Sequence, residues 1–267
     1  MMKTSIRSSL EGTPLLVSST NQAAKFGPIQ AGDILTCQKG NLMTSTGQRA
    51  LMRGSSLANS THVAVVRSVG KKRIVLLEAI NQKDRKGVYV TEYTPETFRE
   101  EFMGVKGVHV LRNDQLSKTL RRTIRDFAKA YGKEGEAKAK YGIKHLASTT
   151  LKTAKDNDKG RLRTVHSYHD GRLMTSKGKE RDKSICSELV AEIVKISQIK
   201  KETKKGHLKG ADLTAKVLKK LQAEGKVLNV SSEHVSVGRI EKELIKHGFH
   251  STAISRDGVY KTSERPR

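Results

Sequence analysis

Apolar residues gather in short, nearly continuous runs in the first half of the chain, the pattern of strands that are covered on both faces. Residues 62–69 and 73–80 are two such runs, separated by Gly70, Lys71 and Lys72. We expect these two runs to pair as an antiparallel hairpin. Shorter runs that follow turn residues predict further strands at residues 31–37, 87–93 and 105–111.

Other apolar residues recur at helical spacing, so we expect helices between and after these strands. Pro95 suits the first position of a short helix that reaches Phe102. Another helix is expected to follow Ser184, because Leu189 and Ile193 repeat on one face. Longer amphipathic helices are predicted at residues 114–131, 211–223 and 235–246.

Polar segments divide this pattern. Residues 1–24 are rich in Ser and Thr and predict a weakly ordered segment. We expect one catalytic domain at residues 25–230, with residues 132–183 as a basic insertion that holds one helix near residues 143–155. Residues 231–267 form a C-terminal helix and a polar tail that begins at residue 256, and residues 200–205 are a solvated basic segment.

Composition indicates the kind of partner and the cellular compartment of the protein. A formal net charge of +25 indicates an anionic partner, although a solvated lysine surface explains it equally well. Two cysteines make no disulfide framework, which favours a reducing compartment. No run reaches the roughly 18 apolar residues of a membrane span, and no secretory signal is present. We expect a cytoplasmic protein, or one exported without an N-terminal signal and delivered into another cell.

Cys186 is the first candidate for chemistry. With Ser184 as the N-cap, the cysteine lies near the second helical position, where free N–H groups and the helix dipole favour a negative thiolate. The alternative is that Cys186 is one more small buried apolar residue.

His62 and Glu78 are the second candidate pair. If the hairpin loop has three residues, Val69 faces Arg73, and His62 and Glu78 become diagonal neighbours on one face. A two-residue loop would put them on opposite faces, because side chains alternate along a strand. A thiol, a base and a third group that orients the base are what thiol catalysis requires.

Five short motifs occur in a fixed order along the chain and resemble one enzyme family. The motifs are Gly32-Asp33-Ile34-Leu35, Thr61-His62-Val63-Ala64-Val65-Val66, Leu77-Glu78-Ala79, Cys186-Ser187-Glu188-Leu189-Val190 and Gly210-Ala211-Asp212-Leu213. Together they resemble the circularly permuted NlpC-type papain-like cysteine hydrolases, the YiiX-like group, over about residues 31–213. The histidine strand precedes the cysteine helix, as permutation implies.

The resemblance implies an α+β fold with a permuted papain-like core, in which the nucleophile helix packs on an antiparallel sheet. It implies that Cys186 is the nucleophile, His62 the base and Glu78 the residue that orients the imidazole, with no cofactor. The implied activity is that of an amidase or peptidase that passes through an acyl-thioester. Ala64 stands where family members commonly have Gly, and Tyr141-Gly142 is only faintly similar to their Tyr-Asp pair.

Two other functions stay open. The related lecithin retinol acyltransferase group shares the permuted order, so a lipid-directed acyltransferase or phospholipase at an anionic membrane is the first alternative. The second is a non-catalytic protein that binds an anionic partner such as an acidic protein. Nucleic acid is less favoured, because aromatic residues make up only 4% of the chain and no known nucleic-acid module is present. No Gly-Lys-Ser/Thr phosphate loop is present either, which argues against nucleotide hydrolysis.

The remaining candidates have ordinary explanations. His166 and His169 could bind a metal, but their spacing favours two exposed imidazoles in a polar loop. Asp33 is expected to close a turn by bonding its own backbone. Cys37 is expected to be a buried apolar residue, and Glu188 to cap its helix or stabilise the helix dipole.

Overall fold

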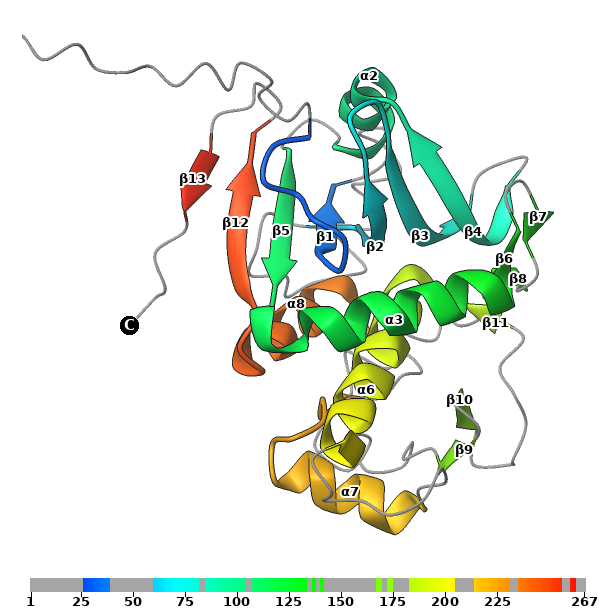
Figure 1. Ribbon diagram of the computed structural model, residues 1–267, viewed down its shortest axis with the longest axis vertical. Coiled ribbons are helices and arrows are strands. Elements are labelled where there is room, and N and C mark those ends of the chain that lie inside the picture. The colour runs from blue at the N-terminus through cyan, green and yellow to red at the C-terminus, as the bar shows by residue number, and fades with distance from the viewer. Residues whose placement is uncertain are drawn as a thin grey trace, which may run out of the picture.

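The computed structural model describes residues 26–38, 60–81, 85–103, 107–133, 136–137, 140–141, 167–169, 172–174, 183–204, 214–230, 235–255 and 260–262. It confirms an α+β protein built on a seven-stranded antiparallel sheet in the order β13-β12-β5-β1-β2-β3-β4 (Figure 1). The strands are β1 (Ile34–Cys37), β2 (His62–Val69), β3 (Ile74–Asn81), β4 (Lys86–Tyr93), β5 (Val108–Arg112), β12 (His250–Ile254) and β13 (Tyr260–Thr262).

Helices lie on both sides of this sheet. On one side are α3 (Asp114–Tyr131), α6 (Cys186–Lys204) and α8 (Val237–Lys246), and on the other are α2 (Pro95–Thr97) and the π-helical turn η1 (Phe98–Phe102). The helix α7 (Ala215–Ala223) lies beyond the far end of α6 (Figure 1). Short strand pairs make up the rest: β6 (Gly132–Lys133) with β7 (Glu136–Ala137), β8 (Lys140–Tyr141) with β11 (Lys183–Ser184), and β9 (Ser167–His169) with β10 (Arg172–Met174).

Two hydrophobic clusters cover the two faces of the sheet, because alternate strand residues point to opposite faces. The α3–α6 cluster contains one set of strand residues together with α3, α6 and α8: Ile34, Val63, Val65 and Leu77. The α2–η1 cluster contains the alternate set together with Phe98 and Phe102: Leu35, Ala64, Val66 and Leu76. Both faces of the central strands are therefore buried, as their continuous apolar runs predict.

The β2–β3 hairpin differs from the prediction at its turn. Val69 pairs with Ile74, not with Arg73, and the turn closes through a hydrogen bond of 2.8 Å from Gly70 N to the carbonyl oxygen of Arg73. A β-bulge between Val66 and Ser68 then shifts the ladder by one residue. An extra residue reverses the side-chain alternation on one strand only. The bulge thus restores the register that a three-residue loop would have given.

Most predicted elements are confirmed, and several boundaries change. Helix α3 and strand β2 have the predicted bounds, whereas α7 and α8 begin later, after the N-caps Thr214 and Ser236. Helix α6 continues to Lys204, so the predicted solvated segment at 200–205 begins within a helix. The sequence predicts a polar tail where β13 pairs with β12. The segments predicted at 1–24 and 143–155 lie outside the described residues.

No helix among the described residues has the length and apolar character needed to cross a membrane.

Gly107 allows β12 to reach β5. Its φ is +83°, and a Cβ atom at this position would overlap the backbone carbonyl oxygen of Ile254. Only glycine avoids both the strained backbone conformation and this overlap. The close approach of the last residue of β12 therefore depends on a residue that lies outside both strands.

We predict that Gly107→Ala lowers the free energy of unfolding by about 2–5 kcal/mol, the sum of the left-handed strain and the steric overlap. Gly225→Ala is the matched control, since Gly225 has φ +67° and nothing within 4 Å of the added Cβ. It should cost only the backbone strain of about 1–2 kcal/mol. Urea unfolding measures both, and equal costs would show that the Ile254 carbonyl imposes no constraint.

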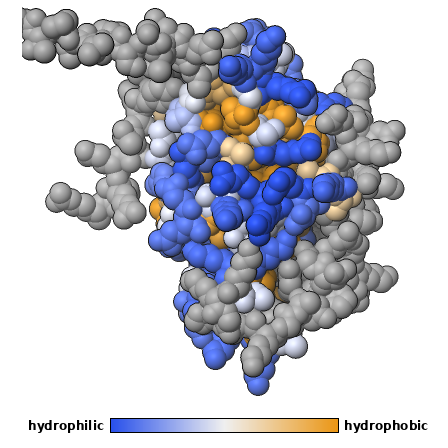
Figure 2. Space-filling view, in the orientation of Figure 1, coloured by the Kyte–Doolittle hydropathy of each residue, from blue (hydrophilic) through white to orange (hydrophobic). Residues whose placement is uncertain are grey.

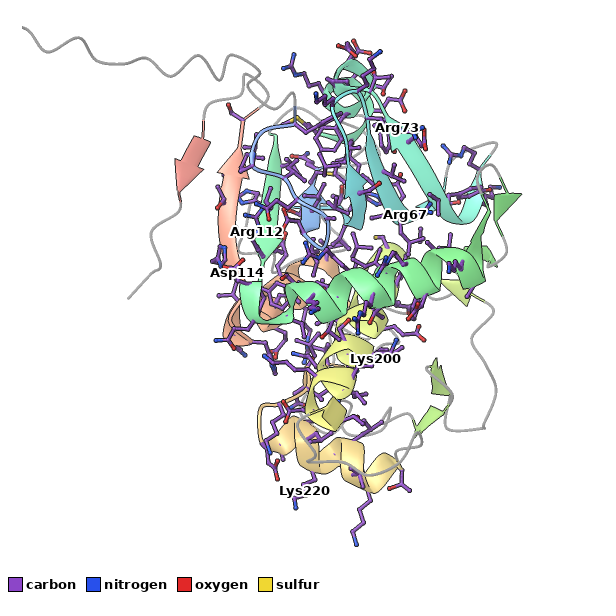
Figure 3. The ribbon with its side chains drawn as sticks, viewed as in Figure 1. Arg67, Arg73, Arg112, Asp114, Lys200 and Lys220 are labelled. Carbon is purple, nitrogen blue, oxygen red and sulfur yellow. The ribbon has the colours of Figure 1, made fainter. Side chains whose placement is uncertain are left out.

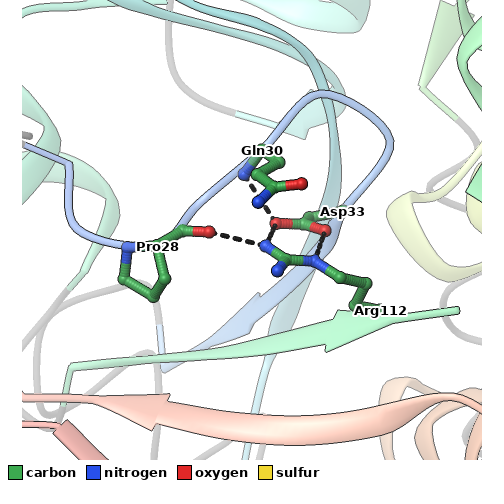
Figure 4. A network of polar contacts seen from close by, with 4 residues as sticks. All are labelled: Pro28, Gln30, Asp33 and Arg112. Carbon is green, nitrogen blue, oxygen red and sulfur yellow. Dashed lines mark hydrogen bonds and ion pairs between the residues drawn. The ribbon is translucent and has the colours of Figure 1, made fainter. Parts of the chain in front are cut away.

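Asp33 fastens the turn before β1 to the end of β5 (Figure 4). Both of its carboxylate oxygens accept bonds from Arg112, at 2.7 Å from Nε and 2.6 Å from a terminal nitrogen. Asp33 also accepts a bond of 2.7 Å from Gln30 N, and Arg112 donates one of 2.6 Å to the carbonyl oxygen of Pro28. The bond to the Gln30 amide confirms the turn role that the sequence predicts for Asp33. The hydrogen bonds that Arg112 donates to Asp33 raise the pKa of Arg112.

We predict that Asp33→Asn and Arg112→Gln each cost about 2–4 kcal/mol, because each leaves its partner's charge unpaired. The side chains of Arg112 and Asp33 are only 19% and 3% exposed, so water compensates little. The double variant should be about 1–3 kcal/mol more stable than the sum of the single costs implies. Arg73→Gln at the exposed Arg73–Glu92 pair is the control and should cost less than about 1 kcal/mol. Additive costs at Asp33 and Arg112 would contradict the coupling.

Candidate active site

A buried polar network joins three neighbouring strands on the α2–η1 side of the sheet. The Nε2 atom of His62, the first residue of β2, lies 2.7 Å from Oε2 of Glu78 on β3. The hydroxyl of Tyr93, the last residue of β4, donates a bond of 2.6 Å to Oε1 of the same carboxylate. Glu78 is fully buried, and His62 and Tyr93 are buried as well. The structure therefore brings His62 and Glu78 together as predicted.

The carboxylate determines what the imidazole can do. When Glu78 is ionised, its carboxylate only accepts hydrogen bonds, and Nε2 of His62 then donates to it and leaves the lone pair on Nδ1. Nδ1 is then the nitrogen that can accept a proton. Burial raises the pKa of Tyr93 far above its usual value, and the nearby Glu78 raises it further. Tyr93 therefore stays a neutral donor to Glu78 at all ordinary pH values.

Aromatic rings from η1 cover this network. The ring centroid of Phe102 lies 5.7 Å from that of His62 and 5.9 Å from that of Tyr93, both edge to face. Phe98 stacks on Phe102 at 5.2 Å. A capping box between Thr94 and Thr97 starts this helical segment directly after β4. The rings exclude water from the His62–Glu78 hydrogen bond, which strengthens it.

Sequence reasoning missed Tyr93 and Phe102, although the sequence holds a signal for Tyr93. Tyr93 pairs with Ile74, four residues before Glu78 on β3, so the two side chains share a face. A tyrosine on the same face as a buried carboxylate is a natural hydrogen-bond donor. No comparable signal exists for Phe102, because a π-helical turn sets its direction.

Cys186 is the first residue of α6, one position earlier than predicted. Ile185, not Ser184, is the N-cap, since its carbonyl accepts the first helical bond from Leu189 N at 3.0 Å. Oε2 of Glu188 accepts a bond of 3.1 Å from Ile185 N, which confirms the capping role predicted for Glu188. Ser184 lies in β11 instead. The thiol is thus at a helix N-terminus, and Cys186 is 5% exposed.

The thiol and the imidazole lie on different faces of the sheet. Cys186 belongs to the α3–α6 cluster, with Val63 and Val65 of β2. His62 has the alternation of Ala64 and Val66, which belong to the α2–η1 cluster, and its ring contacts Phe102. The structure thus joins two of the three predicted catalytic residues and holds the third across the sheet.

The other cysteine lies on the histidine's face. Cys37 of β1 is the direct cross-strand partner of His62 and belongs to the α2–η1 cluster. Directly opposite residues have Cβ atoms about 4.5–5.5 Å apart. Cys37 forms no disulfide bond and is 2% exposed, which confirms the prediction that it is buried. The sequence did not reveal that it faces His62.

His166 and His169 are the predicted metal candidates. His166 is outside the described residues, and His169 ends β9. Across the described ranges, no three His, Cys, Asp or Glu residues gather in a way that could hold a metal ion.

No family model, curated protein or solved structure matches the chain, so the papain-like resemblance stays an interpretation of its motifs.

We predict that Tyr93→Phe lowers the free energy of unfolding at pH 8 by about 1–3 kcal/mol, because one oxygen of buried Glu78 loses its donor. The difference in free energy of unfolding between the wild type and Tyr93→Phe should shrink as the pH rises above about 10. At such pH values the tyrosine ionises in the unfolded chain, while its raised pKa keeps Tyr93 neutral in the folded protein. The wild type therefore loses about 1.4 kcal/mol of stability per pH unit through this residue, and Tyr93→Phe does not.

Urea unfolding at pH 8, 10 and 11 measures this difference. Tyr89→Phe is the matched control, since Tyr89 is a buried tyrosine on the same strand whose hydroxyl does not bond Glu78. A gap between wild type and Tyr93→Phe that stays constant with pH would contradict the burial of a neutral phenol.

Proposed function

We propose that this protein is a thiol hydrolase of amide or ester bonds, in which His62 is the general base and Glu78 orients it. The observation that carries the proposal is the buried bond of 2.7 Å between His62 Nε2 and Glu78 Oε2. A histidine held by a carboxylate through one ring nitrogen presents the other nitrogen as a base. Cys186 at the start of α6 is the proposed nucleophile, since a helix N-terminus stabilises a thiolate.

In the proposed reaction, His62 takes up one proton from the thiol and later gives it to the leaving group. Nδ1 of His62 takes the thiol proton, and the thiolate sulfur bonds to the substrate carbonyl carbon. The backbone N–H of Cys186 is an orphan donor of the helix start and can stabilise the oxyanion. Collapse breaks the bond to the leaving amine or alcohol, which receives the proton from His62. Water then attacks the acyl-thioester, and His62 again transfers the proton.

This reaction has a geometric requirement. Cys186 packs in the α3–α6 cluster and His62 in the α2–η1 cluster, so the two side chains must leave this arrangement to exchange a proton. A reaction that keeps the arrangement would use Cys37, the cross-strand partner of His62. That register makes Cys37 the second candidate nucleophile of the same function.

The chain contains only two cysteines, so each single variant is the control for the other. We predict that Cys186→Ala abolishes hydrolysis and labelling by an electrophilic thiol probe, whereas Cys37→Ala keeps at least half of the rate. The reverse result would assign the nucleophile to Cys37. Hydrolysis that survives the double variant Cys37→Ala/Cys186→Ala would overturn thiol catalysis altogether.

We predict that iodoacetamide alkylates the catalytic thiol at lower pH in the wild type than in His62→Ala, because the imidazole stabilises the thiolate. Glu78→Gln should slow hydrolysis by about 10- to 1,000-fold, less than His62→Ala does, since it keeps a hydrogen-bond acceptor for Nε2. His62→Ala combined with loss of the thiol should be scarcely slower than either single change. Identical alkylation profiles in wild type and His62→Ala would show that no thiol pairs with this histidine.

The substrate class is tested with three probes, namely a fluorogenic peptide library, a branched isopeptide and a vesicle-bound acyl lipid. Turnover of either amide probe supports an amidase, and turnover of the lipid alone would replace it with a lipid-directed enzyme. The thiol variants show whether each signal comes from this site.

A further inference from the structure

Helix α3 carries a line of cations on its exposed side. Lys118, Arg122, Arg125 and Lys129 are spaced by three or four residues, so they share one helical face, and Arg121 lies beside them. All five residues are exposed. Lys129 lies eleven residues after Lys118, or about 16 Å along the helix at 1.5 Å per residue. We call these five residues the α3 ridge. Figure 2 shows the hydrophilic surface that spans the molecule where α3 lies in Figure 1.

Four of the five ridge residues have no carboxylate partner among the described residues, unlike several basic side chains elsewhere in the protein. Arg73, Arg112 and Lys200 each lie within 2.9 Å of a carboxylate, and Lys226 and Lys246 do so as well. Within the part of the chain that the structure describes, no carboxylate pairs with Lys118, Arg121, Arg122 or Arg125. Asp126, the one acidic residue among them, instead pairs with Lys200 of α6 at 2.9 Å. Figure 3 labels Lys200 on α6, the helix that packs against α3.

The positive charges of the α3 ridge repel one another and destabilise α3. Like charges three or four residues apart destabilise a helix, and the ridge holds five such pairs. A surface that served only solubility would intersperse both signs of charge. The apolar face of α3, with Leu116, Leu120 and Ile124, packs in the core. This packing does not account for the cations on the exposed face. An anionic ligand would remove the repulsion.

We infer that the α3 ridge binds the phosphate backbone of a nucleic-acid duplex without regard to sequence. A single line of charges on a convex helix matches a single line of phosphates, whereas a flat membrane favours charges spread over an area. Three of the five residues are arginines, which bond phosphate oxygens in pairs. The duplex form is favoured because single strands need exposed aromatic rings for stacking, and none of the described side chains of α3, residues 114–130, is an exposed aromatic ring.

A membrane is the less suitable partner. Helices that lie on a bilayer bury an apolar face in it, and that face of α3 is packed against the sheet. Among the described residues the only exposed large hydrophobic side chain is Ile245, on α8. The ridge therefore has no apolar neighbour that could enter a bilayer. This inference is independent of the thiol chemistry, since none of the five residues has a role in the proposed reaction.

Fluorescence anisotropy with a labelled 20-base-pair DNA duplex of arbitrary sequence tests the inference, using the full chain between 50 and 200 mM salt. We expect the logarithm of the association constant to fall with the logarithm of salt with a slope of about −4, from four to five phosphate contacts. Arg122→Gln/Arg125→Gln should weaken binding at least tenfold and reduce the slope by about 2. Arg122→Lys/Arg125→Lys should restore the slope.

The matched control is Lys216→Gln/Lys219→Gln, which removes two exposed cations from α7, far from α3 in Figure 1. It should change the affinity less than twofold. An equal loss in both double variants would show that net charge, not the ridge, binds DNA, and would overturn the inference. Binding to vesicles of 30% phosphatidylserine without binding to the duplex would overturn it in favour of a membrane. Unchanged thermal unfolding midpoints confirm that the exposed substitutions leave the fold intact.

Discussion

The buried carboxylate of Glu78 is the constraint on which the central sheet depends. A carboxylate with no exposed surface is tolerated only when hydrogen bonds replace its water, and here a donor comes from each neighbouring strand. A slip of β3 by one residue would turn Glu78 into the aliphatic α3–α6 cluster, away from both donors. The polar network therefore fixes the register of β2, β3 and β4 together, including the bulge between Val66 and Ser68.

The same constraint gives the site its chemistry. Tyr93 and His62 bond the two carboxylate oxygens, which fixes the orientation of the imidazole. The rings of Phe98 and Phe102 keep the network dry, and they follow Tyr93 directly because Thr94 and Pro95 begin a helical segment there. Stability and preorganisation thus come from one set of contacts, and a variant that loosens the network affects both.

The sequence predicts the strands and the histidine–glutamate pair well, because both depend on local pattern. His62 and Glu78 belong to one hairpin, and their relation requires only a register. The face on which Cys186 packs is different. A strand that is apolar on both faces carries no alternation to show which face a distant helix covers, so Val63 and Ala64 look equivalent in sequence. The strand β12 was missed because its residues are mostly half-exposed and of mixed character.

The sheet also separates the two proposed sites. The His62–Glu78 network lies on the α2–η1 side, and α3 covers the other side with its ridge turned outward. A phosphate held by Arg122 or Arg125 is therefore separated from His62 by the helix and the sheet, and cannot take part in the proton transfer. The excess of positive charge and the hydrolytic chemistry consequently act through different surfaces. Cys186, which shares the side of α3, is the only proposed catalytic residue whose surroundings a bound duplex could alter directly.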